Sequence, residues 1–238
     1  MIMLEHGSIR VKMVCMVTRT RQAERRTDAL SKERIVEAAV EILDADGESA
    51  LTFRALAARL ATGAGAIYWH VANKSGLLTA ATDYVISNVV TGVASGAEPR
   101  EAVRAIALGM FDAIDAHPWV GTQLSHEPWQ PAIVQIFEGI GGQLQALGVP
   151  ERAQFDCASA FVSYILGLAG QYAAGVRLLP PDTDRTAFLR TVAARWAQLD
   201  AAEYPFVHQM ARQLPEHDDR EQFLAGIDLI LAGITAAR

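Results

Sequence analysis

The chain has 238 residues, 51% of them apolar, and carries a formal net charge of −6. This length suits one large domain or a small domain joined to a larger one, and the glycine, proline and charged contents are typical of globular rather than disordered proteins. The negative charge argues against a generally basic nucleic-acid binder, and no apolar run reaches the ~18 residues that a membrane span needs.

The two cysteines, Cys15 and Cys157, lie far apart and fit no metal-binding or redox spacing. A reducing cytoplasm is the simplest location for such a chain, so we expect a cytoplasmic protein without a membrane contact. We also expect no cofactor and no metal ion. His117 and His126, for example, are nine residues apart, which matches no recognised metal site.

Charge is unevenly distributed along the chain. Residues 1–80 hold 11 Lys and Arg against 9 Asp and Glu, whereas residues 81–238 hold 10 against 18. Residues 1–30 form a basic tail, which we expect to be disordered. Its basic residues include Arg10, Lys12, Arg19, Arg21, Arg25 and Arg26. Two interpretations of this tail stay open, namely contact with DNA phosphates and a plain solvated leader.

Helical periodicity dominates the sequence and no convincing strand-like alternation occurs, which predicts an all-α fold. Ser31 and Asn73 are suitable N-caps, and Gly47 is a suitable C-cap. Four helices are predicted in the first 90 residues, at 31–46, 53–60, 64–70 and 73–90. Further helices are predicted at 99–116, 127–147, 151–178, 184–201 and 219–236.

Residues 52–70 have the pattern of a helix-turn-helix. This motif needs small residues where its two helices meet, and Ala57, Ala58, Ala61 and Gly63 supply them. In such a motif the second helix lies in the major groove of DNA while the first crosses the backbone. Short helical corners occur in any helical bundle, so the spacing alone also allows a purely structural corner.

Three segments carry a more specific signal: "IVEAAVEILDADG", "LTFRALAARL" and "IYWHVANKSGLL". Together they resemble the TetR family of tetracycline-repressor-like regulators over about 50 residues, from Ser31 to Ala80. The closing "FLAGIDLILAGI" is similar to the last helix of the C-terminal domains of that family. The resemblance implies a three-helix DNA-binding head at 31–78, joined to a larger helical effector-binding and dimerisation domain at 79–238. It implies a homodimeric repressor that a small molecule releases from double-stranded operator DNA.

The resemblance also implies roles for single residues. The implied DNA-binding residues are Thr52, Arg54, Ala64, Gly65, Ala66, Tyr68, Trp69, His70 and Lys74. Thr52 would cap the second helix beside a phosphate, Arg54 would reach a base or phosphate, and Lys74 would clamp the backbone. The positions 64–66 lack hydrogen-bonding side chains, so base reading there would need thymine-methyl contacts or DNA shape. For Tyr68 and Trp69, packing against the first helix is the alternative interpretation.

The C-terminal part has apolar stripes that suit a dimer interface. In the helices at 151–178 and 219–236, apolar residues recur at amphipathic spacing. The predicted interface residues are Phe161, Phe223, Ile227, Ile230 and Ile234. Gly226 and Gly233 would let helices approach closely there. A monomer core is the alternative explanation for the same stripes.

Large or polar side chains within mostly apolar segments are candidates for a ligand pocket, because pockets combine apolar walls with a few polar anchors. The predicted ligand-binding residues are Phe111, His117, Trp119, Trp129, Phe137, Tyr164 and Gln171. They favour a small apolar or aromatic effector. Each of these residues, taken singly, is also compatible with an ordinary core or surface position.

Other functions explain less of the sequence. An enzyme is not expected, because the chain has no glycine-rich phosphate loop, paired cysteine site, His-Glu helix motif or nucleophile elbow. An all-helical carrier or scaffold without operator binding is the main alternative, but it leaves the 52–74 pattern unexplained. Activation instead of repression also stays open, since DNA binding does not fix the sign of regulation.

Overall fold

The structure is a computed structural model that describes residues 30–93, 96–127, 129–178 and 183–236. These residues form helices joined by turns and contain no strand, which confirms the predicted all-α fold. Nearly all of the basic tail at 1–30 lies outside the described residues. Among the helices that the structure describes, none is both long and apolar enough to cross a membrane.

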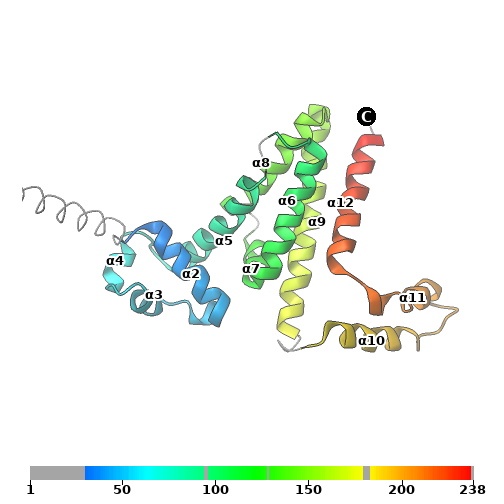
Figure 1. Cartoon of the computed structure of the whole chain (residues 1–238), viewed down its shortest axis with the longest axis horizontal. Helices are drawn as coiled ribbons and strands as arrows, with labels where there is room; N and C mark the ends of the chain where they lie inside the picture. The colour runs from blue at the N-terminus through cyan, green and yellow to red at the C-terminus, as the bar shows by residue number, and fades with distance from the viewer. Residues whose placement is uncertain (1–29, 94–95, 128, 179–182, 237–238) are drawn as a thin grey trace, which may run out of the picture.

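A cluster of short helices forms a head at one end of the molecule (Figure 1). It consists of α2 (Lys32–Asp46), the short 3-10 helix η1 (Glu48–Ala50), α3 (Phe53–Arg59) and α4 (Ala64–Tyr68). Helix α5 (Lys74–Thr91) leads from this head into a larger helical body. The small head and the larger body are therefore joined by one continuous helix, α5.

The starts of the head helices are fixed by side-chain caps. The side-chain oxygens of Ser31, Thr52 and Asn73 each accept a hydrogen bond from the backbone N–H three residues later, at 3.3, 3.1 and 2.8 Å. Such bonds satisfy amide groups that have no partner within the helix. Gly47 ends α2 with a φ of 74°, a left-handed conformation that glycine adopts without strain. These local predictions are confirmed.

The body contains α6 (Pro99–Ala116), α7 (Pro118–His126), α8 (Pro131–Ala146), α9 (Glu151–Leu178) and α12 (Asp219–Ala236). Helix α7 was not predicted, and the helix predicted at 127–147 begins only at Pro131. Both differences have one cause. Pro118 and Pro131 stand in the first turns of α7 and α8, where proline starts a new helix because its missing N–H is not needed.

A smaller segment projects from the body beyond the end of α9 (Figure 1). It contains α10 (Arg185–Trp196), α11 (Pro205–Met210) and the 3-10 helix η2 (Leu214–Glu216), and α10 packs on η2. The helix predicted at 184–201 thus ends five residues early, and α11 was not predicted. Six residues are too short to produce a clear periodic pattern.

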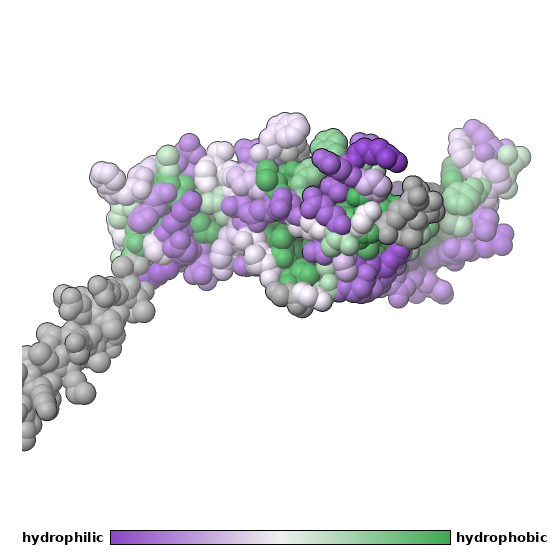
Figure 2. Space-filling view, turned by 90° about the horizontal axis from the view of Figure 1, so that it is seen from above, coloured by the Kyte–Doolittle hydropathy of each residue, from purple (hydrophilic) through white to green (hydrophobic). Residues whose placement is uncertain are grey.

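One hydrophobic core runs from the head into the body. In the head, Leu56 and Ile67 are fully buried, and in the body the same holds for Ile106, Ile136 and Phe161. Apolar surface shows through the middle of the body between polar rims (Figure 2). The core therefore holds the head on α5 and leaves the outer surfaces of α3 and α4 available.

Candidate functional site

The angle between α3 and α4 is set by a tight turn. Ala61 has a φ of 50°, which lies in the left-handed region. Among the described residues, no other residue except glycine has a φ there. The N–H of Thr62 donates to the carbonyl of Ala57 at 2.9 Å, which closes the turn. Leu56 on α3 and Ile67 on α4 are fully buried, so both helices are anchored on the core. This arrangement is a helix-turn-helix.

The structure brings the predicted DNA-binding residues together on α3, α4 and the first turn of α5, at the head end of the molecule. The exposed residues are Thr52, Arg54, Gly65, Tyr68, Trp69 and His70, and the half-buried ones are Ala64, Ala66 and Lys74. Thr52 also caps α3, as its hydroxyl accepts from the N–H of Ala55. Most of the set is therefore accessible on and beside the helix-turn-helix.

Two aromatic side chains stand out on this surface. Trp69 is 90% exposed, so the alternative that it packs in the core is wrong. Tyr68 is 54% exposed, and its ring stacks on Phe53 with centroids 4.1 Å apart and an interplanar angle of 6°. The stack joins the end of α4 to the start of α3. Large exposed aromatic groups are costly in water unless a partner covers them.

Lys74 has a second contact that the sequence did not indicate. Its Nζ donates to the backbone carbonyl of Glu48 at 2.6 Å and lies 3.9 Å from the Glu48 carboxylate. The ammonium group therefore holds η1 against the start of α5. A sequence pattern could not reveal this bond, because it joins positions 26 residues apart through a backbone oxygen.

Charge is segregated within the head. Residues 51–80 contain Arg54, Arg59 and Lys74 and no Asp or Glu. The six carboxylates of the head all lie between 33 and 48, on α2 and η1. One of them, Glu41, forms an ion pair of 2.6 Å with Arg59. The helix-turn-helix itself thus carries no acidic side chain, although the whole chain is acidic, and Glu41 and Glu48 beside it are paired with Arg59 and Lys74, which reduces their repulsion of phosphate groups.

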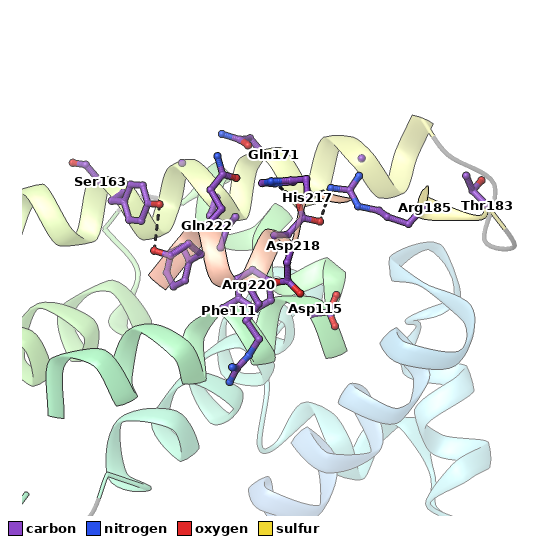
Figure 3. Close-up of a pocket in the computed structure, with 16 residues that line it drawn as sticks. Phe111, Asp115, Ser163, Gln171, Thr183, Arg185, His217, Asp218, Arg220 and Gln222 are labelled. Carbon is purple, nitrogen blue, oxygen red and sulfur yellow. Dashed lines mark hydrogen bonds and ion pairs between the residues drawn. The ribbon is translucent and has the colours of Figure 1, made fainter. Parts of the chain in front are cut away.

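A cavity of about 1050 Å³ lies between α6, α9 and α12 (Figure 3). One end is aromatic: the Phe223 ring lies 5.5 Å from Phe111 and 5.3 Å from Tyr164, on which it is stacked. The Tyr164 hydroxyl donates to the carbonyl of Phe223 at 3.3 Å, and burial raises the pKa of this phenol. The hydroxyl is therefore neutral and can take part in hydrogen bonding at physiological pH.

The other end of the cavity is charged (Figure 3). Arg185 at the start of α10 pairs with Asp219, and His217 lies 3.2 Å from the same carboxylate. Asp115 and Asp218 also line this end. Sequence reasoning missed these polar residues because they come from helix ends that are far apart in the chain. The cavity thus combines an aromatic wall with polar groups, as ligand sites commonly do.

The structure places only some of the predicted ligand-binding residues at the cavity. Phe111, Tyr164 and Gln171 line the cavity, and the other four do not. Trp129 is 90% exposed, and the Phe137 ring stacks on Phe155 at 6.3 Å. His117 and Trp119 both contact Asp44 of the head. Aromatic character alone did not distinguish a cavity wall from a helix contact. Among the described residues, no group of three His, Cys, Asp or Glu could hold a metal ion.

The predicted interface residues also differ in how far they are buried within the single chain. Phe161, Phe223 and Ile227 are buried within the single chain, so they are core residues and have no surface to offer a partner. Gly226 packs closely on Tyr164 of its own chain. Ile230 and Ile234 are only partly buried. The apolar stripe of α12 therefore serves the monomer core on one side, which was the alternative explanation, and leaves the other side accessible.

Comparison with known proteins agrees with this architecture. The model of "Bacterial regulatory proteins, tetR family" matches residues 35–81, and that of "Tetracyclin repressor-like, C-terminal domain" matches residues 95–238. A transcriptional regulator from Streptomyces coelicolor is 55% identical, with 87% of this chain and 99% of that chain covered and a TM-score of 0.79.

Two further relatives are more distant. An HTH-type transcriptional regulator from Saccharopolyspora erythraea is 32% identical over 150 residues, which is 63% of this chain and 64% of that protein, less than two thirds of its length. BioQ bound to its double-stranded DNA operator is 29% identical, with 63% of this chain and 92% of that chain covered and a TM-score of 0.52. By the two family models, which together span both the head and the body, this chain belongs to the tetR family of bacterial regulatory proteins.

Proposed function

We propose that this protein is a ligand-responsive transcriptional repressor that binds operator DNA as a homodimer. The observation that carries the proposal is the exposed helix-turn-helix whose residues 51–80 contain three basic and no acidic side chains. The operator-bound relative BioQ supports the same assignment. In this proposal the protein acts by binding, without catalysing a reaction, in the cytoplasm where the DNA is.

In the proposed complex, α4 enters the major groove and α3 crosses the phosphate backbone. Arg54 offers a guanidinium fork to a base edge or a phosphate, and Tyr68 and His70 offer donors to phosphate oxygens. The reading positions 64–66 are Ala-Gly-Ala, so the groove-facing part of α4 is small and apolar. Such a surface reads thymine methyl groups and groove shape, not hydrogen-bond patterns.

Dimerisation is proposed because this motif recognises two half-sites about one helical turn apart. The accessible side of α12 supplies apolar surface for it. Leu229 is 74% exposed, and Ile230 and Ile234 are partly buried in the single chain. These residues replace the buried ones as our candidates for the contact between protomers.

The effector is proposed to enter the cavity beside Phe111, Tyr164 and Phe223. A cavity of about 1050 Å³ accommodates a drug-sized molecule. Its aromatic end suits a flat apolar body, and its charged end suits a hydrogen-bonding group on the same molecule. An effector releases DNA only through its preference for the non-binding conformation, and a hundredfold preference corresponds to about 2.7 kcal/mol.

The test is direct measurement of DNA binding. Duplexes selected from random sequence should bind the dimer at least ~10³-fold more tightly than unselected DNA at physiological salt. Arg54→Ala should reduce this preference, whereas Arg212→Ala, which removes an exposed arginine of the projecting segment, should not. Failure to enrich any sequence would favour the alternative of a helical carrier or scaffold.

A further inference from the structure

Helix α7 lies between the head and the walls of the cavity. Its body-facing side is apolar, since Val120 and Leu124 are buried and the helix packs extensively on α9. Its first turn follows directly on α6, whose residue Asp115 lines the cavity. Helices α9 and α6, on which α7 packs most, are therefore walls of the cavity, and α7 also contacts α5. Its other side meets the head through polar contacts.

The strongest of these contacts converge on one carboxylate oxygen at the end of α2. Asp44 Oδ1 lies 2.7 Å from His117 Nδ1 and 2.7 Å from Trp119 Nε1. A carboxylate oxygen only accepts here, so the histidine proton is on Nδ1 and both rings donate. Trp119 is 9% exposed, whereas the His117 and Asp44 side chains are 27% and 34% exposed, so the bond from Trp119 is the better shielded of the two charge-assisted hydrogen bonds.

Longer and therefore weaker polar contacts also join α7 and the residue after it to η1 and α5. Gln123 Nε2 donates to Glu48 of η1 at 3.3 Å, and the hydroxyls of Ser75 and Thr79 lie 3.5 Å from the Glu127 carboxylate. The two sides of α7 therefore differ in the kind of contact that they make. Apolar packing fixes α7 to the body, whereas a few hydrogen bonds join it to the head.

We propose that Asp44, His117 and Trp119 are positioning residues for operator binding: they fix the angle of the head relative to the body. This inference rests on the proposed function. Helix α5 and the shared hydrophobic core join the head to the body, and the bonds to Asp44 add a directional polar attachment at the end of α2. Since the cavity walls hold α7, these bonds are also the place where a change in the cavity reaches the head.

The consequence is specific to two-headed binding. Two heads must enter successive grooves together, so an uncertain head angle weakens binding to a full operator and leaves binding to a single half-site unchanged. It also makes the dimer more tolerant of altered half-site spacing. A variant that merely unfolds the head would weaken both kinds of binding equally.

The test uses Trp119→Phe, which keeps a buried aromatic ring and removes the N–H donor, with Trp196→Phe on α10 as the matched control. Trp119→Phe should bind the full operator about tenfold more weakly, bind a half-site duplex unchanged, and lose less affinity than the wild type when one base pair is inserted between half-sites. Asp44→Leu should behave in the same way. Equal behaviour of Trp119→Phe and Trp196→Phe, or an equal loss on half-site DNA, would overturn the proposal.

The head angle can also be measured without DNA, which separates this inference from the proposed function. Spin labels at Ala72→Cys in the head and Glu151→Cys at the start of α9, with both native cysteines replaced by serine, report the distance between head and body. Trp119→Phe should broaden that distance distribution and Trp196→Phe should not. A wild type that selects no DNA sequence refutes the proposed function, whereas an unchanged distribution in Trp119→Phe refutes the positioning role.

The link to the cavity is tested by placing a side chain inside it. Gly167 lines the cavity, and a Cβ there would meet no atom within 4 Å. Gly167→Phe should lower full-operator affinity when it is introduced into the wild type. In the Trp119→Phe background it should have little further effect, because the effects of coupled sites are not additive. Sedimentation checks that both remain dimers. An effect of equal size in both backgrounds, or none in the wild type, would overturn the link.

Discussion

Replacing Gly226 on α12 should destabilise the protein, because a Tyr164 ring occupies the space that a side chain would need. A Cβ at Gly226 would lie 2.1 Å from Tyr164 Oη and 2.4 Å from Cζ, whereas favourable contacts between heavy atoms are about 3.5–4.0 Å. The ring therefore has to move by more than an ångström. It cannot do so freely, since it stacks on Phe223 and donates a hydrogen bond to the Phe223 carbonyl.

The expected size follows from what the movement breaks. Loss of the stacked pair costs about 0.5–1.5 kcal/mol and loss of the hydrogen bond about 1 kcal/mol. Alanine regains about 0.5–1 kcal/mol through its better helix propensity. Gly226→Ala should therefore lower the free energy of unfolding by about 0.5–2 kcal/mol, which overlaps the usual range for overpacking.

Urea unfolding provides the assay, with the midpoint compared at an unchanged slope. The control is Gly141→Ala in the middle of α8, where a Cβ would meet no atom within 4 Å and the same substitution should stabilise by about 0.5–1 kcal/mol. Because Tyr164 is a cavity wall, Gly226→Ala should also change the cavity shape. If both variants became more stable, the close approach of Tyr164 would not constrain position 226.

Three further predictions concern single side chains. Arg54→Ala should cost ~1–3 kcal/mol on the selected operator and relax the preference at one base position, and a uniform loss on all sequences would make Arg54 a phosphate contact. Lys74→Ala should weaken binding to all duplexes alike and lower the salt slope by ~1, and an unchanged slope would mean that the bond to Glu48 is its whole role. Burial raises the pKa of Asp83, which accepts from Gln135 at 2.5 Å, so its charge destabilises the fold more as the pH rises above the ordinary carboxyl range. Asp83→Asn should therefore be more stable than the wild type at pH 7 by unfolding titration, with the difference vanishing below the ordinary carboxyl pKa, at about pH 3, and an advantage that persisted there would exclude ionisation as its cause.

Much of the head could be predicted from sequence because its signals are local. Ser31, Thr52 and Asn73 each cap a helix through an amide only three residues away. The small residues at the turn act within the turn itself. Local chemistry of this kind is fully present in a short stretch of sequence, so both the helix starts and the all-α class followed from it.

The body was less predictable because its contacts join distant positions. His117 and Trp119 were assigned to a ligand pocket for their ring types, yet they bond to Asp44, more than seventy residues earlier. Likewise, the period of α12 indicates an apolar stripe, but not whether that stripe meets its own chain or another one. In the structure Phe223 and Ile227 face their own chain's core.

The separation of charge within the head has a consequence for kinetics. The carboxylates between 33 and 48 stand on α2 and η1, where Glu41 and Glu48 pair with Arg59 and Lys74, whereas α3 and α4 themselves carry two arginines and no acidic residue. A molecule with this polarity experiences a torque in the field of a DNA duplex, so it should arrive with the reading helix foremost despite its net charge of −6. Encounters in other orientations are repelled. Rapid association at low ionic strength and poor retention on non-specific DNA are thus compatible in one protein, and the arrangement favours frequent, short sampling of the genome.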